Sequence, residues 1–481
     1  MKLHRMILTG VLLLQCAIAQ NSVDVVRYSP STTSAGSRAL GMGNAYIGVS
    51  DDFTASVWNP AGLAQMRRLE VMGGFSNTGL SNDGSYHGTT TNSSLGSTSL
   101  NNVGFVFPFP TTQGSLVFAF GYNRINNFAS TLEFTGYNGE SSIIPTLYSD
   151  DASYDVPFNT YLTNSAGYSA VQKDVNQRGS IREGGGLGQW NFAGAIDIEE
   201  NISFGLSLNV FSGTYDYTRN FVEEDTRNVY NNTQTALPAD SAYLRFNKFY
   251  LDNYISSELN GSNIMMGLMY RSEVFRAGLT VKGSSTIRVK ETYSDEGQSV
   301  FDNNGGTWAT TNPAKKYSTP VSNNEYSVES PWTFGAGASL YILPEFLVAA
   351  DVEQTDWTQV RFSDNPYLEK KNPSLQKQFR SVLAYRFGAE FDIPMTDAKV
   401  RAGYSHTPSP YVNDPSSYDR NLITLGAGIL LQRNVALDAA AAFGTSKNFQ
   451  TQYSVSGLPG TARVDESLTT SLFTLTVSYR F

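Results

Sequence analysis

The chain has 481 residues, and its 43 acidic side chains outnumber its 34 basic ones, which gives a net charge of −9. This acidic balance argues against a nucleic-acid partner. The single cysteine, Cys16, lies in a predicted cleaved leader, so the mature chain is expected to hold no disulfide, thiol nucleophile or cysteine metal site.

Residues 1–19 have the composition of a secretory signal peptide. A basic start precedes a short apolar stretch and a small-residue cleavage site (Lys2, His4 and Arg5, then residues 6–14, then Ala17-Ile18-Ala19). The mature chain would therefore begin near Gln20. A lipoprotein signal around Cys16 is the alternative, although Gln15 occupies the position where a small residue is expected.

Residues 20–66 precede the first predicted strand, and within them residues 34–66 do not alternate as a strand would. They are rich in glycine, and Asn59-Pro60-Ala61 has the chemistry of a helix start, with Asn as N-cap and Pro at the first position. Small residues and short helical pieces predict an N-terminal plug, or hatch, inside a lumen, with a periplasmic linker as the alternative. The predicted hatch and gating residues are Gly41, Gly43, Asn59, Pro60 and Ala61.

Residues 67–481 predict an all-β fold, a 14-stranded antiparallel transmembrane β-barrel. Apolar and polar residues alternate with period two, as expected where one face meets lipid and the other a lumen. Short turns and long polar loops also alternate along the chain, which a soluble sandwich does not require. The predicted strands are residues 69–77, 100–108, 114–126, 188–199, 202–210, 262–272, 275–292, 328–343, 345–362, 383–391, 398–405, 423–431, 435–443 and 469–481.

Two long loops interrupt this pattern, at residues 127–187 and 220–261. No structure is predicted for the first. In the second, the aromatic spacing before Asn260-Gly261 predicts an amphipathic helix, which either packs as a lid over the barrel mouth or forms an external apolar groove. The predicted ligand-capture residues of this loop are Phe246, Phe249, Tyr250 and Tyr254.

Several basic side chains fall on predicted lumen faces. Arg386 and Arg401 are candidates for binding a ligand carboxylate, because Arg can form a bidentate pair with it. The alternative is a structural network, since Asp351, Glu353, Glu390 and Asp438 also point inward. Ser405 and His406 are adjacent on a strand and face opposite sides, so they do not form a hydrolase pair. We expect no enzyme activity, no cofactor and no metal site.

The last residues, 469–481, place Phe473, Leu475, Val477, Tyr479 and Phe481 on one strand face. Bacterial outer-membrane barrels commonly end on such a strand with a terminal Phe. This pattern predicts the outer membrane of a Gram-negative bacterium as the location. It also predicts membrane lipid and lipopolysaccharide as surroundings, and recognition of Phe481 by the barrel-assembly machinery.

Residues 37–45 (SRALGMGNA), Asp51-Asp52 and residues 58–64 (WNPAGLA) resemble the N-terminal hatch of the FadL family. Residues 351–357 (DVEQTDW) are similar to a late strand of that family, and the last hundred residues resemble its closing strands. The resemblance covers nearly the whole mature chain except the two long loops.

The FadL family comprises outer-membrane transporters of long-chain fatty acids and of aromatic hydrocarbons such as toluene. The resemblance implies a 14-stranded barrel that captures hydrophobic small molecules, such as fatty acids, with its extracellular loops. A hatch-gated lumen would then pass them sideways through the wall. Related barrels with similar hatches act in protein secretion, so a shuttle or scaffold of a secretion system is the alternative.

Overall fold

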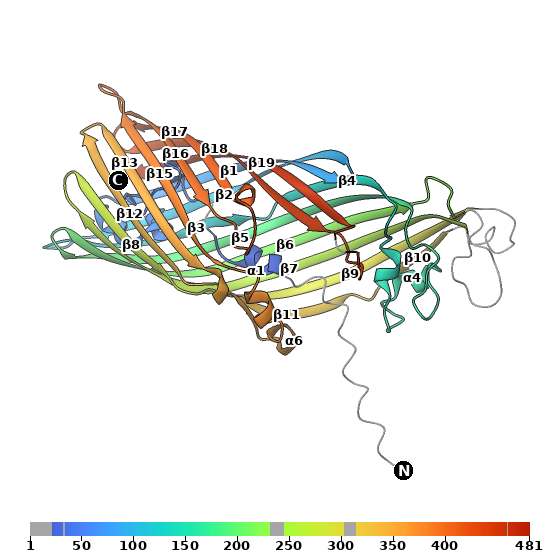
Figure 1. Cartoon of the computed structure of the whole chain (residues 1–481). Helices are drawn as coiled ribbons and strands as arrows, with labels where there is room; N and C mark the ends of the chain where they lie inside the picture. Colours follow the sequence, from blue (N-terminus) through green and yellow to red (C-terminus); the bar gives the residue numbers. More distant parts are fainter. Residues whose placement is uncertain (1–21, 32–33, 231–244, 303–313, 459) are drawn as a thin grey trace, which may run out of the picture.

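The computed structural model describes residues 22–31, 34–230, 245–302, 314–458 and 460–481. The predicted signal peptide lies outside the described residues. The described chain forms one elongated barrel, with several short helices inside it and at one end (Figure 1).

A single antiparallel sheet of 19 strands closes on itself, because β1 pairs with β19 as well as with β2. The strands are β1 (Glu70–Tyr86), β2 (Thr89–Phe109), β3 (Leu116–Asn127), β4 (Ser130–Asn138), β5 (Val175–Glu199), β6 (Ile202–Glu224), β7 (Arg245–Arg271), β8 (Phe275–Lys282), β9 (Thr286–Asp302), β10 (Ala314–Ser318), β11 (Ser322–Glu329), β12 (Thr333–Leu343), β13 (Phe346–Asp356), β14 (Arg361–Ser363), β15 (Ser381–Asp392), β16 (Ala398–Thr407), β17 (Arg420–Leu431), β18 (Val435–Thr451) and β19 (Arg463–Arg480).

These strands occupy 14 positions around the barrel, which confirms the predicted fold class. Four positions are each filled by two consecutive strands, namely β3 with β4, β8 with β9, β11 with β12, and β13 with β14. β10 pairs with β9 at the far end of the barrel. Short connections join the strands at the end that carries the C-terminus (Figure 1). At the other end most connections are long, as in outer-membrane barrels, although residues 87–88 alone join β1 to β2.

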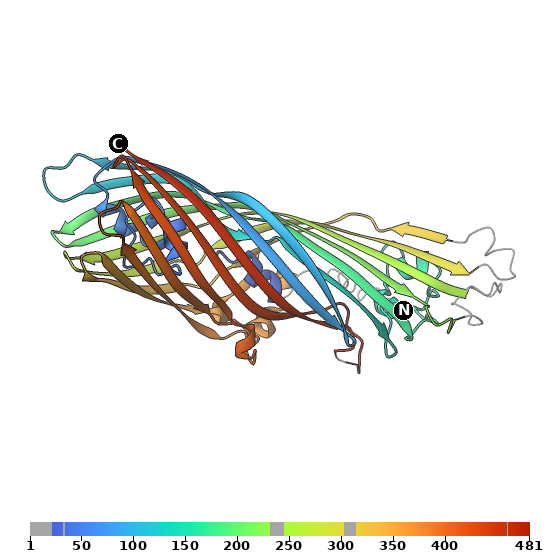
Figure 2. The same ribbon diagram turned by 90° about the horizontal axis from the view of Figure 1, so that it is seen from above.

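The parts of the strands nearer the end that carries the C-terminus present a band of apolar side chains to the outside. On β6, Leu206 and Val210 are exposed, whereas Ser207 and Asn209 between them are buried in the lumen. Strands β5, β6, β7 and β9 extend well past this band, so one side of the wall projects further than the other (Figure 2). This projection forms the extracellular end.

Both long loops contain more strand than the sequence predicts. The amphipathic helix predicted before Asn260-Gly261 is wrong: its described residues belong to β7, while Tyr243 and Leu244 lie outside the described residues. The spacing of the apolar residues in this segment did not distinguish a helical period from that of a strand. In the structure β7 pairs with both β6 and β9, so its backbone amides and carbonyls form their hydrogen bonds within the sheet. Residues 127–187, predicted to lack structure, include β4 and the first half of β5.

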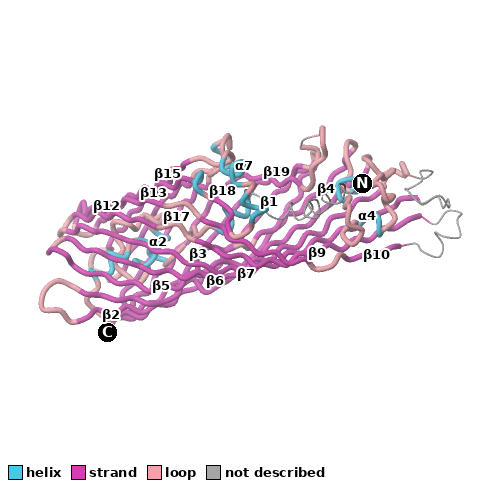
Figure 3. The backbone as a smooth tube through the Cα atoms, turned by 90° about the horizontal axis from the view of Figure 1, so that it is seen from below, coloured by secondary structure: helices cyan, strands magenta, loops and turns pink. Residues whose placement is uncertain are grey.

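The described residues 22–31 and 34–66 lie inside the barrel. They contain α1 (Ser22–Tyr28), α2 (Ser37–Gly41), α3 (Ala55–Trp58) and the 3₁₀-helix η2 (Pro60–Gln65). α2 lies near the end that carries the C-terminus (Figure 3), whereas α1 lies near the middle of the barrel (Figure 1). At the predicted helix start, the Asn59 side chain accepts a hydrogen bond from the Ala61 amide at 3.2 Å.

The other helices lie in the longer connections. They are η3 (Ile144–Leu147), α4 (Val156–Asn159), η4 (Trp357–Gln359), α6 (Pro366–Glu369), α7 (Asn372–Gln376) and η5 (Ser416–Tyr418). Among the described helices, none is long and apolar enough to cross a membrane.

Candidate functional site

Residues 34–66, which we call the plug, contact the barrel wall through glycines. A Cβ on Gly41 would lie 3.1 Å from the Gly426 Cα, and one on Gly43 would lie 2.6 Å from the Phe387 carbonyl oxygen. Gly43 also has a φ of +65°, which side chains disfavour. Two of the predicted hatch residues therefore lie where the plug backbone touches the wall directly.

The remaining predicted hatch residues make a second contact, with β7 and β8. Asn59 donates from Nδ2 to the Ile47 carbonyl at 3.0 Å and to the Leu268 carbonyl at 3.3 Å. A Cβ on Gly278 would meet both the Ile47 carbonyl and the Asn59 amide, so this wall position has no room for a side chain. Pro60 and Ala61 lie directly behind Gly205 of β6 in the same way.

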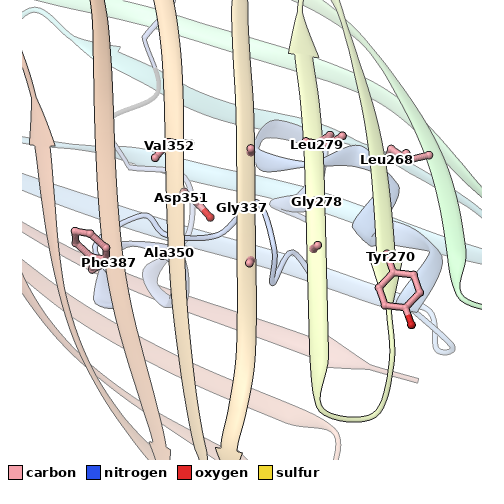
Figure 4. Close-up of a pocket in the computed structure, with 12 residues that line it drawn as sticks. Leu268, Tyr270, Gly278, Leu279, Gly337, Ala350, Asp351, Val352 and Phe387 are labelled. Carbon is pink, nitrogen blue, oxygen red and sulfur yellow. The ribbon is translucent and has the colours of Figure 1, made fainter.

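Figure 4 shows this part of the wall, with the plug behind Gly278 and Gly337. The buried Asp351 carboxylate of β13 accepts two hydrogen bonds from the plug, from the backbone amides of Tyr46 at 2.6 Å and Ile47 at 2.8 Å. The outer surface here has an apolar depression of about 500 Å³. Glycines at Gly278 and Gly337 let the plug lie directly against the wall at this place.

A buried network of charges also attaches the plug to the wall. Arg38 of α2 donates two hydrogen bonds to Glu390 of β15, at 2.8 and 2.9 Å, and also pairs with Asp51. Arg401 of β16 donates to the same Glu390 and to Asp438, both at 2.6 Å. Because two of its donor nitrogens are engaged by carboxylates of the wall, Arg401 belongs to a structural network.

Arg386 of β15, the other predicted carboxylate-binding residue, has a different environment. It is 8% exposed, and its Nη2 donates to Glu353 at 3.2 Å while its Cζ lies 5.7 Å from the centre of the Trp58 ring. Its Nη1 is buried and has no hydrogen-bond partner among the described residues. Arg386 therefore has a donor available for a ligand.

Two further cations lie close to Arg386. Lys282 at the end of β8 lies within electrostatic range of Arg386 and Glu353, and Arg420 at the start of β17 lies within range of Arg386. The facing carboxylates are Glu353 and Asp351, the second of which is engaged by plug amides. The cluster of Lys282, Arg386 and Arg420 is therefore net positive and suited to an anionic group.

Buried apolar side chains pack together along the same wall on the extracellular side of this cluster, and we call this packed region the chamber. β9 continues the wall beyond Lys282 of β8, and its residues Ile287 and Val289 face inward and are fully buried. The chamber, a single cluster of buried apolar side chains, is formed by Val25, Tyr28, Ile125, Phe128, Leu187, Phe211, Tyr215, Leu259, Ile287, Val289, Tyr326, Val328, Val360, Phe362, Leu368, Leu375 and Phe379. Val25 and Tyr28 belong to α1, so this helix occupies part of the chamber.

A second apolar cluster fills the extracellular projection. Phe246 and Phe249 of β7 belong to it and are 1% and 0% exposed. Tyr254 faces outward and is 42% exposed, and Tyr250 is half-buried on the same outer side. The four predicted capture residues are thus divided between two faces, because Phe249 alternates with Tyr250 and Tyr254 along the strand. A bulge between Phe246 and Lys248 brings Phe246 to the same inward face as Phe249. Tyr217 of β6 packs against both apolar clusters and connects them.

The extracellular cluster encloses a buried carboxylate. Glu223, near the far end of β6 and well beyond the apolar band, accepts hydrogen bonds from Ser142 Oγ at 2.5 Å, the Ile143 amide at 2.8 Å and Gln177 at 2.6 Å. Burial raises the pKa of Glu223 to about 7. These bonds attach the loop after β4 to the projecting wall.

Strands β2 and β3 separate at the extracellular edge of the apolar band, where Leu100 of β2 is still exposed on the outside. They pair with each other from Asn102 to Phe109 of β2. Further toward the extracellular end, β2 stays paired with β1, and β3 stays paired with β5. The chain between α1 and α2 passes this seam. Asn126 of β3 bonds to Arg27, Ser29 and Ser31 backbone groups at 3.1 to 3.3 Å, and Asn101 of β2 bonds to Ser34 and Gly36 at 2.8 and 3.1 Å.

Sequence reasoning missed these two asparagines, as well as the position of α1. Their partners are distant in sequence, and an asparagine within a strand gives no local indication of them.

Ser405 is buried in the lumen, whereas the His406 ring stacks on Tyr385, at 4.6 Å between centroids, so the two do not form a catalytic pair. Among the described residues, no cluster of three or more potential metal ligands is present.

A closed barrel with an apolar outer band, an internal plug and an apolar chamber defines a plugged outer-membrane transport protein. The family model for outer membrane protein transport proteins (OMPP1/FadL/TodX) matches residues 187–481. The chain belongs to this family, whose members transport hydrophobic compounds across the outer membrane and are not enzymes. This confirms the predicted family and location.

Solved structures show the same fold. A FadL homologue from Pseudomonas aeruginosa has a TM-score of 0.57 at 13% identity, over 94% of this chain and 100% of that one. The toluene transporter TodX from P. putida has a TM-score of 0.53 at 13% identity, over 92% and 98%. A search of curated proteins finds no match. Similarity at this level of identity concerns the fold and not the substrate.

Proposed function

We propose that this protein is a passive transporter of anionic amphiphiles with a long apolar chain, such as long-chain fatty acids. The observation that supports this class most directly is the buried Arg386, whose Nη1 has no hydrogen-bond partner among the described residues. Lys282 and Arg420 both lie within electrostatic range of it. A neutral aromatic hydrocarbon carries no negative charge that this cluster of cations could bind. A fatty acid would place its carboxylate there and its chain in the apolar chamber.

The energetics favour such a division of the ligand. Burying apolar chain contributes about 0.8 kcal/mol per methylene, so ten buried methylenes contribute roughly 8 kcal/mol. The carboxylate must lose water to enter the lumen, and a charge-assisted bond to Arg386 offsets that loss. No energy source is needed for binding of this kind.

The path would begin at the extracellular apolar cluster and continue past Tyr217 to the chamber. Phe246 and Phe249 would act there as inward-facing contacts of the entering chain, while Tyr250 and Tyr254 on the outer side would make the first contact. The seam between β2 and β3 offers a sideways exit toward the membrane, because wall pairing stops beyond Asn102.

The test is uptake of radiolabelled oleate by cells that lack their own outer-membrane fatty-acid transporter and express this protein. We expect saturable uptake, reduced at least about tenfold by Arg386→Gln, which corresponds to the 1.4 kcal/mol of one charged hydrogen bond. Arg288→Gln is the matched control, because Arg288 lies on the outer face of β9 with its side chain 64% exposed.

Toluene uptake by the same cells separates the two ligand classes. If toluene enters and oleate does not, the anionic-amphiphile proposal fails and an aromatic substrate is favoured. If neither enters while the barrel is folded in the outer membrane, and a secreted protein co-purifies with it, the secretion-shuttle alternative is favoured.

A further inference from the structure

One side of strand β2 has no neighbouring strand at the extracellular end of the barrel. β2 pairs with β1 from Thr89 to Val106, but with β3 only from Asn102 to Phe109. Among the described residues, the backbone groups of residues 89–100 form hydrogen bonds only with β1. Residues 89–100 therefore form a free sheet edge, which we call the β2 edge.

The turn between β1 and β2 determines which backbone groups point to this edge. His87 and Gly88 form a two-residue hairpin turn, with φ values of 45° and 80°, and Tyr86 pairs with Thr89 across it. The closing pair of such a hairpin exchanges both of its hydrogen bonds, and so does every second pair after it. The residues between them point their N–H and C=O groups away from β1. They are Thr90, Asn92, Ser94, Gly96, Thr98 and Leu100, and all of them are exposed.

The residues of the β2 edge do not prevent another strand from pairing with it. Free edges are commonly protected by charged side chains, prolines, bulges or a covering element. Residues 89–101 (TTTNSSLGSTSLN) contain no charged residue and no proline, and their pairing with β1 has no register shift up to Leu100. A Cβ on Gly96 would meet nothing within 4 Å, so no described residue covers the strand there.

The nearby edge of β4 is closed, in contrast. β4 pairs with β5 on one side, and on the other side Asn82 of β1 donates to the Thr131 carbonyl at 2.8 Å. A Cβ on Gly84 of β1 would lie 2.6 Å from the Glu133 carbonyl oxygen, so β1 lies directly against this edge. An open edge is therefore a property of β2 and not of every strand at the seam.

The wall across the seam from the β2 edge is basic. On the extracellular side of Trp190, the outward-facing charged residues of β3, β4 and β5 are Arg124, Glu133, Arg178 and Arg182. Arg178 and Arg182 are exposed, and the Arg124 Nε is buried without a hydrogen-bond partner in the described part of the chain. Three cations and one carboxylate favour acidic side chains in a strand that lies here.

A second copy of the barrel does not fit the β2 edge. Two copies in one membrane are related by an axis along the membrane normal. Because barrel strands tilt by about 35–45° from that normal, facing strands of two copies would cross at roughly 70–90°. Pairing along an edge requires strands that are close to parallel or antiparallel. A segment outside the membrane is free to take that orientation.

We propose that the β2 edge binds an extended, acidic segment of another polypeptide at the cell surface, which pairs with β2 as an added strand. Backbone hydrogen bonds to residues 90–100 provide the affinity, and acidic side chains near Arg178 and Arg182 provide the selectivity. This inference does not depend on which small molecule the lumen carries. It assigns a protein-binding surface to the outside of the barrel.

The probe is a fluorescent synthetic peptide of about nine residues that alternates Thr and Glu, a typical strand length. It is titrated against the purified full-length protein, and binding is measured by fluorescence anisotropy. One control peptide has methylated backbone nitrogens at its centre, so that neither of its edges can pair, and a second has Lys in place of Glu. We expect each control to bind at least about tenfold more weakly than the probe. Hydrogen exchange of residues 90–100 should slow when the probe binds.

Two double variants of β2 separate backbone from side-chain contributions. Ser94→Pro with Gly96→Pro removes two N–H donors on the side away from β1 and should weaken binding at least about tenfold. Ser94→Ala with Gly96→Ala keeps both donors and should bind as the wild type does. Heat-modifiable migration on gels shows that each variant is folded.

Several results would overturn the inference. They are absence of probe binding to the wild type, equal binding of either control peptide, and wild-type affinity in the folded proline variant. A dimer of the wild-type protein that dissociates in the proline variant would also overturn it, because the β2 edge would then belong to a contact between copies. None of these results bears on oleate uptake, so the proposed function is tested separately.

Discussion

Glu390 offers the sharpest test of how the plug is held. Its buried side chain, 1% exposed, accepts hydrogen bonds from Arg38 of the plug and from Arg401 and Lys399 of the neighbouring strand. Glu390→Gln keeps the shape of the side chain and removes its charge. Three cations then face one another around a neutral amide.

The expected cost follows from the burial of this cluster. Removing one partner of a buried, hydrogen-bonded ion pair typically costs about 3–5 kcal/mol, because the remaining charge is left uncompensated. Arg38 keeps Asp51, and Arg401 keeps Asp438, so we place the effect at the lower end, about 3 kcal/mol. That would shift the balance between seated and released plug roughly a hundredfold.

The assay is single-channel conductance in planar bilayers, combined with heat-modifiable migration on gels to show that the barrel is folded. Wild-type protein is expected to conduct rarely, and Glu390→Gln to open often and widely. Glu296→Gln serves as the control, since Glu296 pairs with Lys316 at the surface and should contribute less than about 1 kcal/mol. A folded Glu390→Gln barrel with wild-type conductance would refute the assignment of the plug as ion-locked.

Three further predictions concern packing and pH. Gly337→Ala brings a Cβ to 2.7 Å from the Ile47 Cβ of the plug, so it should lower the free energy of unfolding by about 1–3 kcal/mol and lower the thermal unfolding midpoint. The control Gly96→Ala meets open space and should leave the midpoint unchanged. Phe249→Ala should cost about 3–5 kcal/mol and reduce oleate uptake, whereas outward-facing Tyr254→Ala should retain wild-type unfolding. The pKa of Glu223 is raised to about 7, above its unfolded value, so its contribution to stability should be greatest below about pH 4.5 and decline as pH rises through 7. The unfolding midpoint should therefore fall between pH 5 and pH 8 by more in the wild type than in Glu223→Gln, and an equal fall would contradict this.

Local alternation was sufficient to predict the membrane band. On β6 and β17, outward apolar residues and inward small or polar residues repeat with period two, and lipid imposes that pattern on every strand. The extracellular ends of the strands have no lipid to impose it. The aromatic residues of β7 could therefore be assigned to a helix, and only its pairing with β6 and β9 makes it a strand.

The contents of the lumen could be predicted only in part. The glycines and Asn59 indicated close packing, and they lie where the plug meets the wall. The partners could not be found, because Arg38 and Glu390 are 352 positions apart and their pairing depends on the closure of the whole barrel. For the same reason, nothing in the sequence separated Arg386, whose Nη1 has no partner in the described part of the chain, from Arg401, which bonds to two carboxylates.

The lumen contains both apolar contacts of α1 and polar contacts of the plug, and a hydrophobic ligand can replace only the first kind. A ligand shifts a conformational equilibrium only by its differential affinity for the two states. An apolar chain can replace the contacts of Val25 and Tyr28, but it offers no carboxylate-binding or amide-binding groups to replace those of Arg38 or Asp351. Burial of an apolar chain therefore does not compensate for loss of the polar contacts between plug and wall, and a route that uses the seam between β2 and β3 would not require that loss.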